Sequence, residues 1–469
     1  MPTPAPTPTA TPTTTPPATA GDNRPPSHLF YQARQRRPMA TRAEGIYIWD
    51  EHGRRVIDGS SGAMVVNIGH GNRRVLDAMK RQMDQATFIY RLHFENAPAE
   101  DLAAALAARC PAGLDRVFFV SGGSEAVESC LKLARQHAVA TGQGSRYKVI
   151  SRFPSYHGST MGALSVTGHA AFTTPFAPMM HESPKIAAPT AYLDRDGLDM
   201  AARGRRYADM LDEEIRRQGP ETVLAFIMEP IGGASTGALV APDSYYPRIR
   251  EICDRHGVLL IHDEVMCGAG RTGRYLGGDH WGITPDLIAL SKGLGAGYAP
   301  LGAMIASEKL VRPVLDAGGF QHGFTYAGNP LAAAAGLAVL DEIDAHDLIG
   351  NAARMGDLLK SRLDALKRRF PFIGDVRGRG LLLAVEFVSD PETMATLPRA
   401  LNAHARMVDL AFDRGLILYS RRTRGGIDGD HVLVCPPMIV TEAQIDEIMA
   451  IFTDTLEALA RELSLPWSA

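Results

Sequence analysis

The sequence predicts an α/β protein with a large, mostly parallel open sheet and a smaller α+β domain. Short, nearly all-apolar runs alternate with helical patterns over about residues 98–305, and this order changes after Asn329. Apolar runs without alternation are typical of strands that are buried on both faces of a parallel sheet. At 469 residues the chain also exceeds what one hydrophobic core usually holds, so two structural units are expected.

The first residues, MPTPAPTPTATPTTTPPATAGDNRPP, consist mostly of Pro, Thr and Ala. They lack the basic start and the apolar stretch of a secretory signal, and they carry too little apolar surface to fold. We therefore expect residues 1–27 to form a disordered tail and residues 28–90 to contribute to the smaller domain. Within the latter segment, GIYIWDEHGRRVID (45–58) predicts two short strands around a turn.

Residues 91–330 are expected to form the large domain. Amphipathic helices are predicted between its strands, as over Glu125–Val139, where small apolar residues repeat on one face. Repetition of a strand followed by a helix gives an open α/β sheet. The predicted strands are RVFFV (116–120), YKVISRF (147–153), TVLAFIMEP (222–230), VLLIHDEV (258–265), DLIALSK (286–292) and PLGAMIA (300–306).

Residues 331–469 are expected to complete the smaller domain, with helices and strands in a different order. The pattern begins with a long helical stretch over 331–370, and it ends with a helix that starts at Glu442. Between them lie VRGRGLLLAVEFV (376–388), a helix over about 398–414, and the apolar runs GLILYS and HVLVCPP.

Composition argues against several classes of protein. With 49 Lys and Arg against 52 Asp and Glu, the net charge is −3, which favours neither nucleic acid nor an anionic membrane as the main partner. No run approaches the roughly 18 apolar residues of a membrane span. The five cysteines are widely spaced and form no CxxC, which predicts neither a disulfide framework nor a metal site and suits a reducing cytoplasm.

Two polar motifs follow predicted strands, at the edge where ligands bind on open α/β sheets. Ser121–Glu125 (SGGSE) opens a helix, and its free N–H groups together with the Ser124 hydroxyl favour a phosphate. The alternative is a glycine-rich turn with a serine cap. Tyr156, in the motif Tyr156-His157-Gly158, could stack on a flat heterocycle or be an ordinary loop aromatic.

Two charged residues also stand at predicted strand ends. Asp263 is costly there unless it meets a cation, such as a protonated pyridine nitrogen; the alternatives are helix capping and a salt bridge. Lys292 lies beside several glycines, and desolvation would lower its pKa toward a nucleophilic amine that forms an imine. Most lysines are surface charges. The following GLGAG lacks the G-x-G-x-x-G order, so a nicotinamide oxidoreductase is disfavoured.

With these motifs, the chain resembles the class III aminotransferases of the ω-amino acid type, which are pyridoxal-phosphate (PLP) enzymes of fold type I. The resemblance implies transamination by a ping-pong mechanism, in which an amine or ω-amino acid gives its amino group to a 2-oxo acid. It extends from about Leu29 to the C-terminus. The motifs that match the family in order and spacing are FFVSGGSEAVES, SYHGSTMGALS, LLIHDEVMCGAGRTG, DLIALSKGLGAGYAPLGAM and HGFTYAGNPLAAAA.

The resemblance also implies roles for individual residues. Lys292 would form the Schiff base with PLP and carry the proton during catalysis, and Asp263 would bind the pyridine nitrogen. Thr325 would come from the neighbouring subunit, which is the reason to expect a homodimer with shared active sites. No metal is expected. The other residues implied in cofactor binding are Gly122, Gly123, Ser124, Tyr156, His157, Glu229 and Val265.

Two departures from the family concern the substrate. Ala234 stands where the 4-aminobutyrate and ornithine branches carry a glutamate that gates a substrate-binding arginine, so we expect other donors. Tyr419 stands near the place where many ω-transaminases carry an arginine, and three arginines follow in what is expected to be a longer loop. Of these three, Arg424 is our candidate for binding a substrate carboxylate; the alternative is a solvated basic loop. Tyr90 is expected in the substrate pocket at the dimer interface.

Two other functions are compatible with these motifs. The same scaffold hosts lyases, racemases, mutases and decarboxylases, because function lies in the site rather than in the fold. A non-catalytic protein with the PLP fold is the second alternative. The presence of both Lys292 and Asp263 argues against it.

Overall fold

The computed structural model describes residues 27–30 and 36–468. The chain divides into two units, Met1–Met39 and Ala40–Ala469, and all the elements below belong to the second. Apart from Ser27, the tail predicted over residues 1–27 lies outside the described residues.

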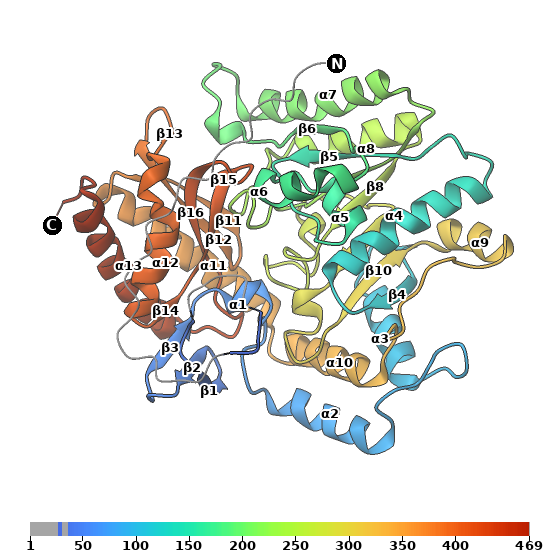
Figure 1. Cartoon of the computed structure of the whole chain (residues 1–469), viewed down its shortest axis with the longest axis horizontal. Coiled ribbons are helices and arrows are strands. Elements are labelled where there is room, and N and C mark those ends of the chain that lie inside the picture. The colour runs from blue at the N-terminus through green and yellow to red at the C-terminus, as the bar shows by residue number, and fades with distance from the viewer. Residues whose placement is uncertain (1–26, 31–35, 469) are drawn as a thin grey trace. The chain divides into compact units, whose positions relative to one another are not determined.

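A seven-stranded sheet contains all the strands that were predicted for the large domain (Figure 1). Its order is β4-β10-β9-β8-β7-β5-β6, and among these strands only β10 runs antiparallel to its neighbours. The prediction of a mostly parallel sheet is confirmed. The strands are β4 (Arg116–Val120), β5 (Lys148–Phe153), β6 (Lys185–Ala187), β7 (Val223–Met228), β8 (Leu259–Asp263), β9 (Leu287–Leu290) and β10 (Gly302–Ala306).

Helices cover both faces of this sheet because side chains alternate along each buried strand. On β7, Ile227 joins the core formed with α4 (Gly123–Ala140), whereas its neighbours Phe226 and Met228 join the core on the opposite face. The remaining helices of these two layers are α5 (Met161–Val166) and α9 (Glu308–Asp316) on the side of α4, and α7 (Met200–Gln218) and α8 (Tyr245–His256) on the other side. The sheet is therefore buried on both faces, as its apolar strands predict.

Two smaller sheets combine early and late parts of the chain. In the first, β14 (Leu416–Ile417) pairs in parallel with β3 (Arg55–Asp58), and β2 (Tyr47–Asp50) and β1 (Ala40–Glu44) follow outward. The second has the order β11-β12-β16-β15, with β13 (Ala395–Thr396) beside β12. Its strands are β11 (Ile373–Arg379), β12 (Leu382–Asp390), β15 (Tyr419–Arg424) and β16 (Asp428–Val434). The domain limits at residues 90 and 330 stay a prediction.

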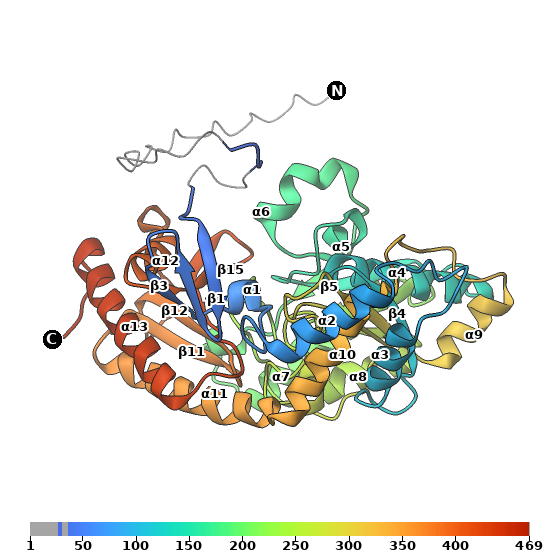
Figure 2. The ribbon, with the colours of Figure 1, turned by 90° about the horizontal axis from the view of Figure 1, so that it is seen from below.

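The helices of the late part gather around these smaller sheets (Figures 1 and 2). They include α12 (Ala403–Asp413) and α13 (Glu442–Leu463), which starts at the predicted residue. The single helical stretch predicted over 331–370 is wrong: it is divided into α10 (Pro330–Ala345) and α11 (Leu348–Ala365). Asp347 causes the break, because it adopts φ 45° and its side chain accepts the N–H of Gly350 as the cap of α11.

Four short or early helices complete the described elements that are used below. They are α1 (Ser61–Met64), α2 (Arg73–Gln85), α3 (Ala97–Ala107) and α6 (Ala170–Thr173). None of the helices in the described ranges combines the length and apolar character that a membrane crossing requires.

Candidate active site

Four of the predicted site residues meet at the carboxyl edge of the seven-stranded sheet. Asp263 is the last residue of β8, and Glu229 directly follows β7. His157 lies in the loop after β5, and Lys292 begins a short 3-10 turn (Lys292–Leu294) after β9. Because β5, β7, β8 and β9 run parallel, these ends lie on one edge of the sheet, where ligands bind in this class of fold.

The N-terminus of α4 forms a cradle for an anion. Its cap position, Gly122, offers no side-chain hydrogen bond, so the first N–H groups of the helix stay available. A Cβ on Gly123 would lie 2.7 Å from Cγ1 of Val265. Gly158 has φ +140°, and a Cβ there would lie 2.6 Å from Oγ of Ser124. Only glycine fits these two positions, and this brings the loop after β5 close to the helix start.

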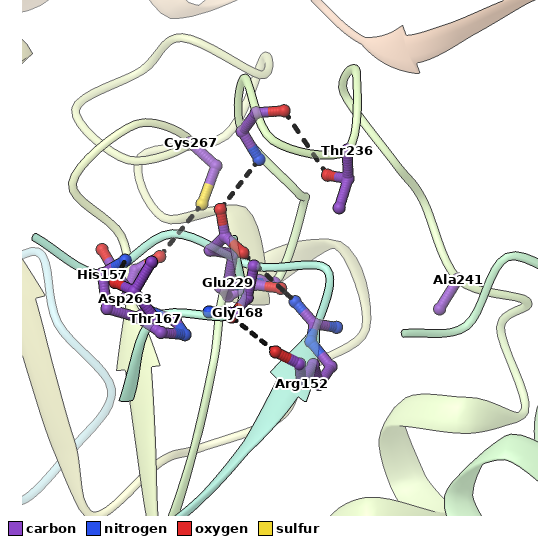
Figure 3. Close-up of polar contacts among 12 residues, drawn as sticks. Arg152, His157, Thr167, Gly168, Glu229, Thr236, Ala241, Asp263 and Cys267 are labelled. Atoms are coloured by element: carbon purple, nitrogen blue, oxygen red, sulfur yellow. Dashed lines mark hydrogen bonds and ion pairs between the residues drawn. The ribbon is translucent and has the colours of Figure 1, made fainter. Parts of the chain in front are cut away.

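Asp263 is a buried carboxylate held in a fixed orientation. Its Oδ2 lies 2.8 Å from Nδ1 of His157, and its Oδ1 accepts the N–H of Val265 at 3.1 Å (Figure 3). The His157 and Asp263 side chains are 0% and 5% exposed. The backbone N–H of His157 donates to Oγ1 of Thr167 at 2.9 Å, which fixes the histidine in turn. A carboxylate buried in this way requires a cationic partner on its remaining side.

Lys292 combines an unusual backbone with an altered pKa. Its φ is +46°, a left-handed conformation that costs energy for a residue with a side chain and that clusters at functional sites. Burial lowers the pKa of its ammonium group, and the negative charges of Asp263 and Glu229 oppose this shift. The environment therefore favours the neutral, nucleophilic amine more than water does.

Glu229 and Arg152 form a second buried pair beside Asp263 (Figure 3). Oε1 of Glu229 accepts the N–H of Gly233 at 3.0 Å, and its Oε2 lies 3.8 Å from Nη2 of Arg152. Burial raises the pKa of Glu229, and the positive charges of His157 and Arg152 oppose this rise. Arg152 was missed from the sequence. Its only signal was a charged residue inside the apolar run YKVISRF, where an arginine is rarely buried unless it is paired.

Tyr156 begins a chain of aromatic and cationic contacts that leads to β15. Its hydroxyl lies 2.9 Å from Oγ of Ser159, and its ring meets Phe172 edge-on with centroids 5.6 Å apart. The guanidinium of Arg421 lies 5.9 Å from the Phe172 ring centroid, and it donates to the Tyr419 hydroxyl at 2.7 Å. Phe172, which the sequence analysis also missed, thus connects Tyr156 with Arg421.

The three arginines do not lie in a long loop, as predicted, but on strand β15. A strand places alternate residues on opposite faces, so Arg421 shares a face with Tyr419 and Arg424 lies on the other face. Nη2 of Arg424 donates to the carbonyl of Met394 at 2.7 Å. Arg424 also lines a separate cavity of about 230 Å³, whose other residues include Phe153, Tyr192 and Thr236.

Tyr90 and Thr325 lie on the surface. Tyr90 is 38% exposed, and Thr325 precedes Tyr326, which is 65% exposed. The ring of Tyr326 meets the ring of Phe88 at 5.9 Å, so the segments around residues 90 and 325 are adjacent. Leu92 and Phe94 also expose most of their apolar surface here, at 79% and 73%.

The chain belongs to the class-III aminotransferases, a family that matches residues 31–456. It is 40% identical over 435 residues to YodT, an uncharacterized aminotransferase of Bacillus subtilis, covering 91% of this chain and 96% of the relative. It is 35% identical over 430 residues to the putrescine–pyruvate aminotransferase of Pseudomonas aeruginosa, with coverages of 90% and 91%. The taurine–pyruvate aminotransferase of Bilophila wadsworthia is 36% identical over 419 residues, with coverages of 87% and 90%.

Solved structures agree with this assignment. An (S)-enantioselective ω-transaminase from Thermomicrobium roseum superposes with a TM-score of 0.87 at 36% identity, over 92% of this chain and 96% of the other. A PLP-bound amine transaminase from an uncultivated Pseudomonas species gives a TM-score of 0.83 at 36% identity, over 92% and 97%. The predicted family, fold, cofactor and reaction class are therefore confirmed: the protein is a PLP-dependent aminotransferase.

The residues at the sheet edge fit this cofactor. PLP carries a phosphate, a ring nitrogen that is protonated for catalysis, and an aldehyde that reacts with an amine. The uncapped start of α4, the buried carboxylate of Asp263 and the amine of Lys292 supply one suitable partner for each group. Among the residues that the structure describes, no cluster of three or more His, Cys, Asp or Glu side chains could hold a metal ion.

Proposed function

We propose that this aminotransferase takes the amino group from an amine or an ω-amino acid and passes it to a 2-oxo acid of the pyruvate type. Ala234 carries this proposal. It is half-buried in an apolar cluster that includes Met64 and Tyr419, at the place of the gating glutamate of the 4-aminobutyrate and ornithine branches. Support also comes from two relatives that are named for putrescine and taurine as partners of pyruvate.

In this proposal the sheet edge binds PLP. The first residues of α4, Gly122–Ser124, hold the phosphate, and Asp263 binds the pyridine nitrogen with His157 behind it. Tyr156 and Val265 contact the ring, and Lys292 is the residue of covalent attachment. When bound, PLP supplies an electron sink for the negative charge that develops at the substrate carbon bearing nitrogen. Thr325 adds to the phosphate site from the partner subunit.

Lys292 and its neighbours are proposed to move the protons. The Nζ atom, released by the incoming donor, takes a proton from the carbon that bears nitrogen and delivers it again during product formation. The lowered pKa of Lys292 suits this role, because a general base must be neutral before it accepts a proton. Asp263 keeps its charge and place because His157 and the N–H of Val265 hold its two oxygens.

Arg421 replaces Arg424 as our candidate for binding the acceptor carboxylate. Its guanidinium is fixed by the Tyr419 hydroxyl and flanked by Phe172, one ring away from Tyr156. A guanidinium can still bind a carboxylate through its remaining N–H groups. Arg424, by contrast, donates to the carbonyl of Met394 from the opposite face of the strand.

We also propose a homodimer that resides in the cytoplasm. The exposed side chains of Phe88, Leu92, Phe94 and Tyr326 make an apolar surface around Tyr90 and Thr325, and such surfaces mark protein interfaces. A second copy would cover them and would place Thr325 against the partner. All five cysteines are free thiols, as is usual in a reducing compartment.

A donor-by-acceptor panel tests the substrate proposal. The PLP-loaded enzyme is given putrescine, taurine, β-alanine or 4-aminobutyrate, each with pyruvate or 2-oxoglutarate, and the amino acid product is measured. We expect the fastest transfer from a diamine or a short ω-amino acid to pyruvate. A preference for 4-aminobutyrate with 2-oxoglutarate would contradict the argument from Ala234.

A further inference from the structure

Two buried polar atoms beside Asp263 have no hydrogen-bond partner among the described residues. They are Nε2 of His157 and Oε2 of Glu229. Their side chains are 0% and 5% exposed. Buried polar groups are normally satisfied, so two orphans near one ligand site call for a functional explanation.

Glu229 is surrounded by charged groups from several elements. Arg152 faces it from β5, His157 from the loop after β5, Asp263 from β8 and Lys292 from the turn after β9. Figure 3 shows Glu229 between the His157–Asp263 pair and Arg152. The charge of His157 is the strongest influence opposing the rise that burial causes in the pKa of Glu229. Charges interact strongly in such a buried, weakly polarisable environment.

We propose that Glu229 is a positioning residue that sets the protonation of His157 and, through it, the charge of Asp263. His157 uses Nδ1 to contact Asp263, so Nε2 is the atom that remains to take up a proton. An anionic Glu229 favours the imidazolium, which weakens the negative charge that Asp263 offers to the ring nitrogen. A neutral group at residue 229 leaves that charge undiminished. This inference rests on the proposed contact of Asp263 with the pyridine nitrogen.

Glu229 also connects this pair with the substrate side of the site. Its Oε1 holds the N–H of Gly233, and a Cβ on Gly233 would lie only 3.1 Å from that oxygen and 2.7 Å from Sδ of Met266. Ala234, the residue proposed to select the donor, is the next residue along this loop. A shift of the loop on substrate binding would therefore change the surroundings of Glu229, and the two sides of the site are coupled through one carboxyl group.

The test is a double-mutant cycle on the enzyme with bound PLP and no substrate. Glu229→Gln keeps an acceptor for Gly233 but removes the charge, and His157→Asn removes the titrating ring. The readout is the pH midpoint of the cofactor's visible absorption band. We expect Glu229→Gln to lower the midpoint by about one pH unit, because a fully charged Asp263 makes the protonated ring draw electrons from the Lys292 nitrogen. In the His157→Asn background this shift should nearly vanish.

Three outcomes would overturn the proposal. The midpoint could stay unchanged in Glu229→Gln, or the full shift could persist without His157, which would mean that Glu229 acts directly on Lys292. The third is an equal shift in Glu264→Gln. Glu264 is a matched control, because burial raises its pKa to about 7 and it binds the N–H groups of Gly277 and Gly278 instead of facing His157.

A conservative variant keeps the test decisive if Glu229→Gln folds poorly. Glu229→Asp retains the charge, so its midpoint should stay close to that of the wild type, and a shift as large as expected for Gln would contradict the proposal. Loss of the visible band from the wild-type enzyme would instead contradict the attachment of PLP to Lys292. The two failures are therefore distinguishable.

Discussion

The carboxyl edge of the seven-stranded sheet and the strand pair β15–β16 both bring charge toward Tyr156, but they hold it differently. At the sheet edge, Asp263 is 4% exposed, and both of its oxygens have partners within the protein. On β15, Arg421 is only half-buried, and it is bound by one hydroxyl and by a neighbouring backbone carbonyl. The first arrangement fixes a protonation state, as reaction chemistry requires. The second keeps a cation hydrated and adjustable, which suits the choice of substrate.

The strand pair reaches the site because its turn rests on the large sheet's loops. Gly425 and Gly426 have φ of +66° and +81°, and a Cβ on either would lie 2.2 Å from the ring of Phe153 or His169. The carbonyl of Gly425 accepts the N–H of Ala170 at 2.8 Å. His169 is itself stacked on Phe172 at 4.3 Å. The place of Arg421 thus depends on a contact between two sheets, whereas that of Asp263 depends on one sheet alone.

Removing Lys292 should have the largest effect on this comparison. Lys292→Ala is expected to lower turnover on the order of 10⁴-fold, because the site loses both its covalent attachment point and its general base. Its thermal unfolding midpoint should stay close to that of the wild type. Lys309→Ala, at an exposed lysine, serves as the control and should retain full activity. Near-normal turnover in Lys292→Ala would refute the assigned role.

The two arginines of β15 provide the next test. Arg421→Ala should raise the KM for pyruvate about ten- to a hundredfold, because a charged hydrogen-bond pair is lost, while kcat changes less. Arg424→Ala is the matched variant from the other face of the strand and should leave that KM nearly unchanged. Steady-state kinetics with one fixed donor would distinguish them. If the larger KM effect belonged to Arg424, the assignment from strand geometry would be wrong.

The smallest effect concerns pH and the docking of β15–β16. Burial lowers the pKa of His169 from 6.5 to about 4, and the charge of Arg421 adds to this shift. The unfolded chain therefore binds a proton at a higher pH than the folded chain does. Stability that is present above about pH 6.5 should be lost as the pH falls toward 4. Urea unfolding should show a shallower loss in His169→Gln and an unchanged one in a variant of the exposed His52. Equal slopes for the wild type and His169→Gln would contradict this assignment.

The sequence was informative where a costly residue ends an apolar run. Asp263 and Lys292 could be proposed on that ground, because charge at the end of a buried strand needs a purpose. Arg152 lies inside such a run, and its partner Glu229 follows another strand 77 residues later, so only the folded sheet brings them together. Arg424 was preferred over Arg421 because the segment was expected to be a loop. Once it is a strand, its two-residue period decides which arginine faces the tyrosines.

The parallel pairing of β3 with β14 has a consequence for biosynthesis. Ile57 pairs with Leu416, so 359 residues separate the two partners along the chain. At the usual rate of synthesis, roughly 5–20 residues per second, the second partner follows the first by roughly 20–70 s. Throughout this interval β3 presents an open edge that its final neighbour will later cover. The nascent chain must therefore be protected from association for most of its time on the ribosome, and the first sheet to be translated is among the last to close.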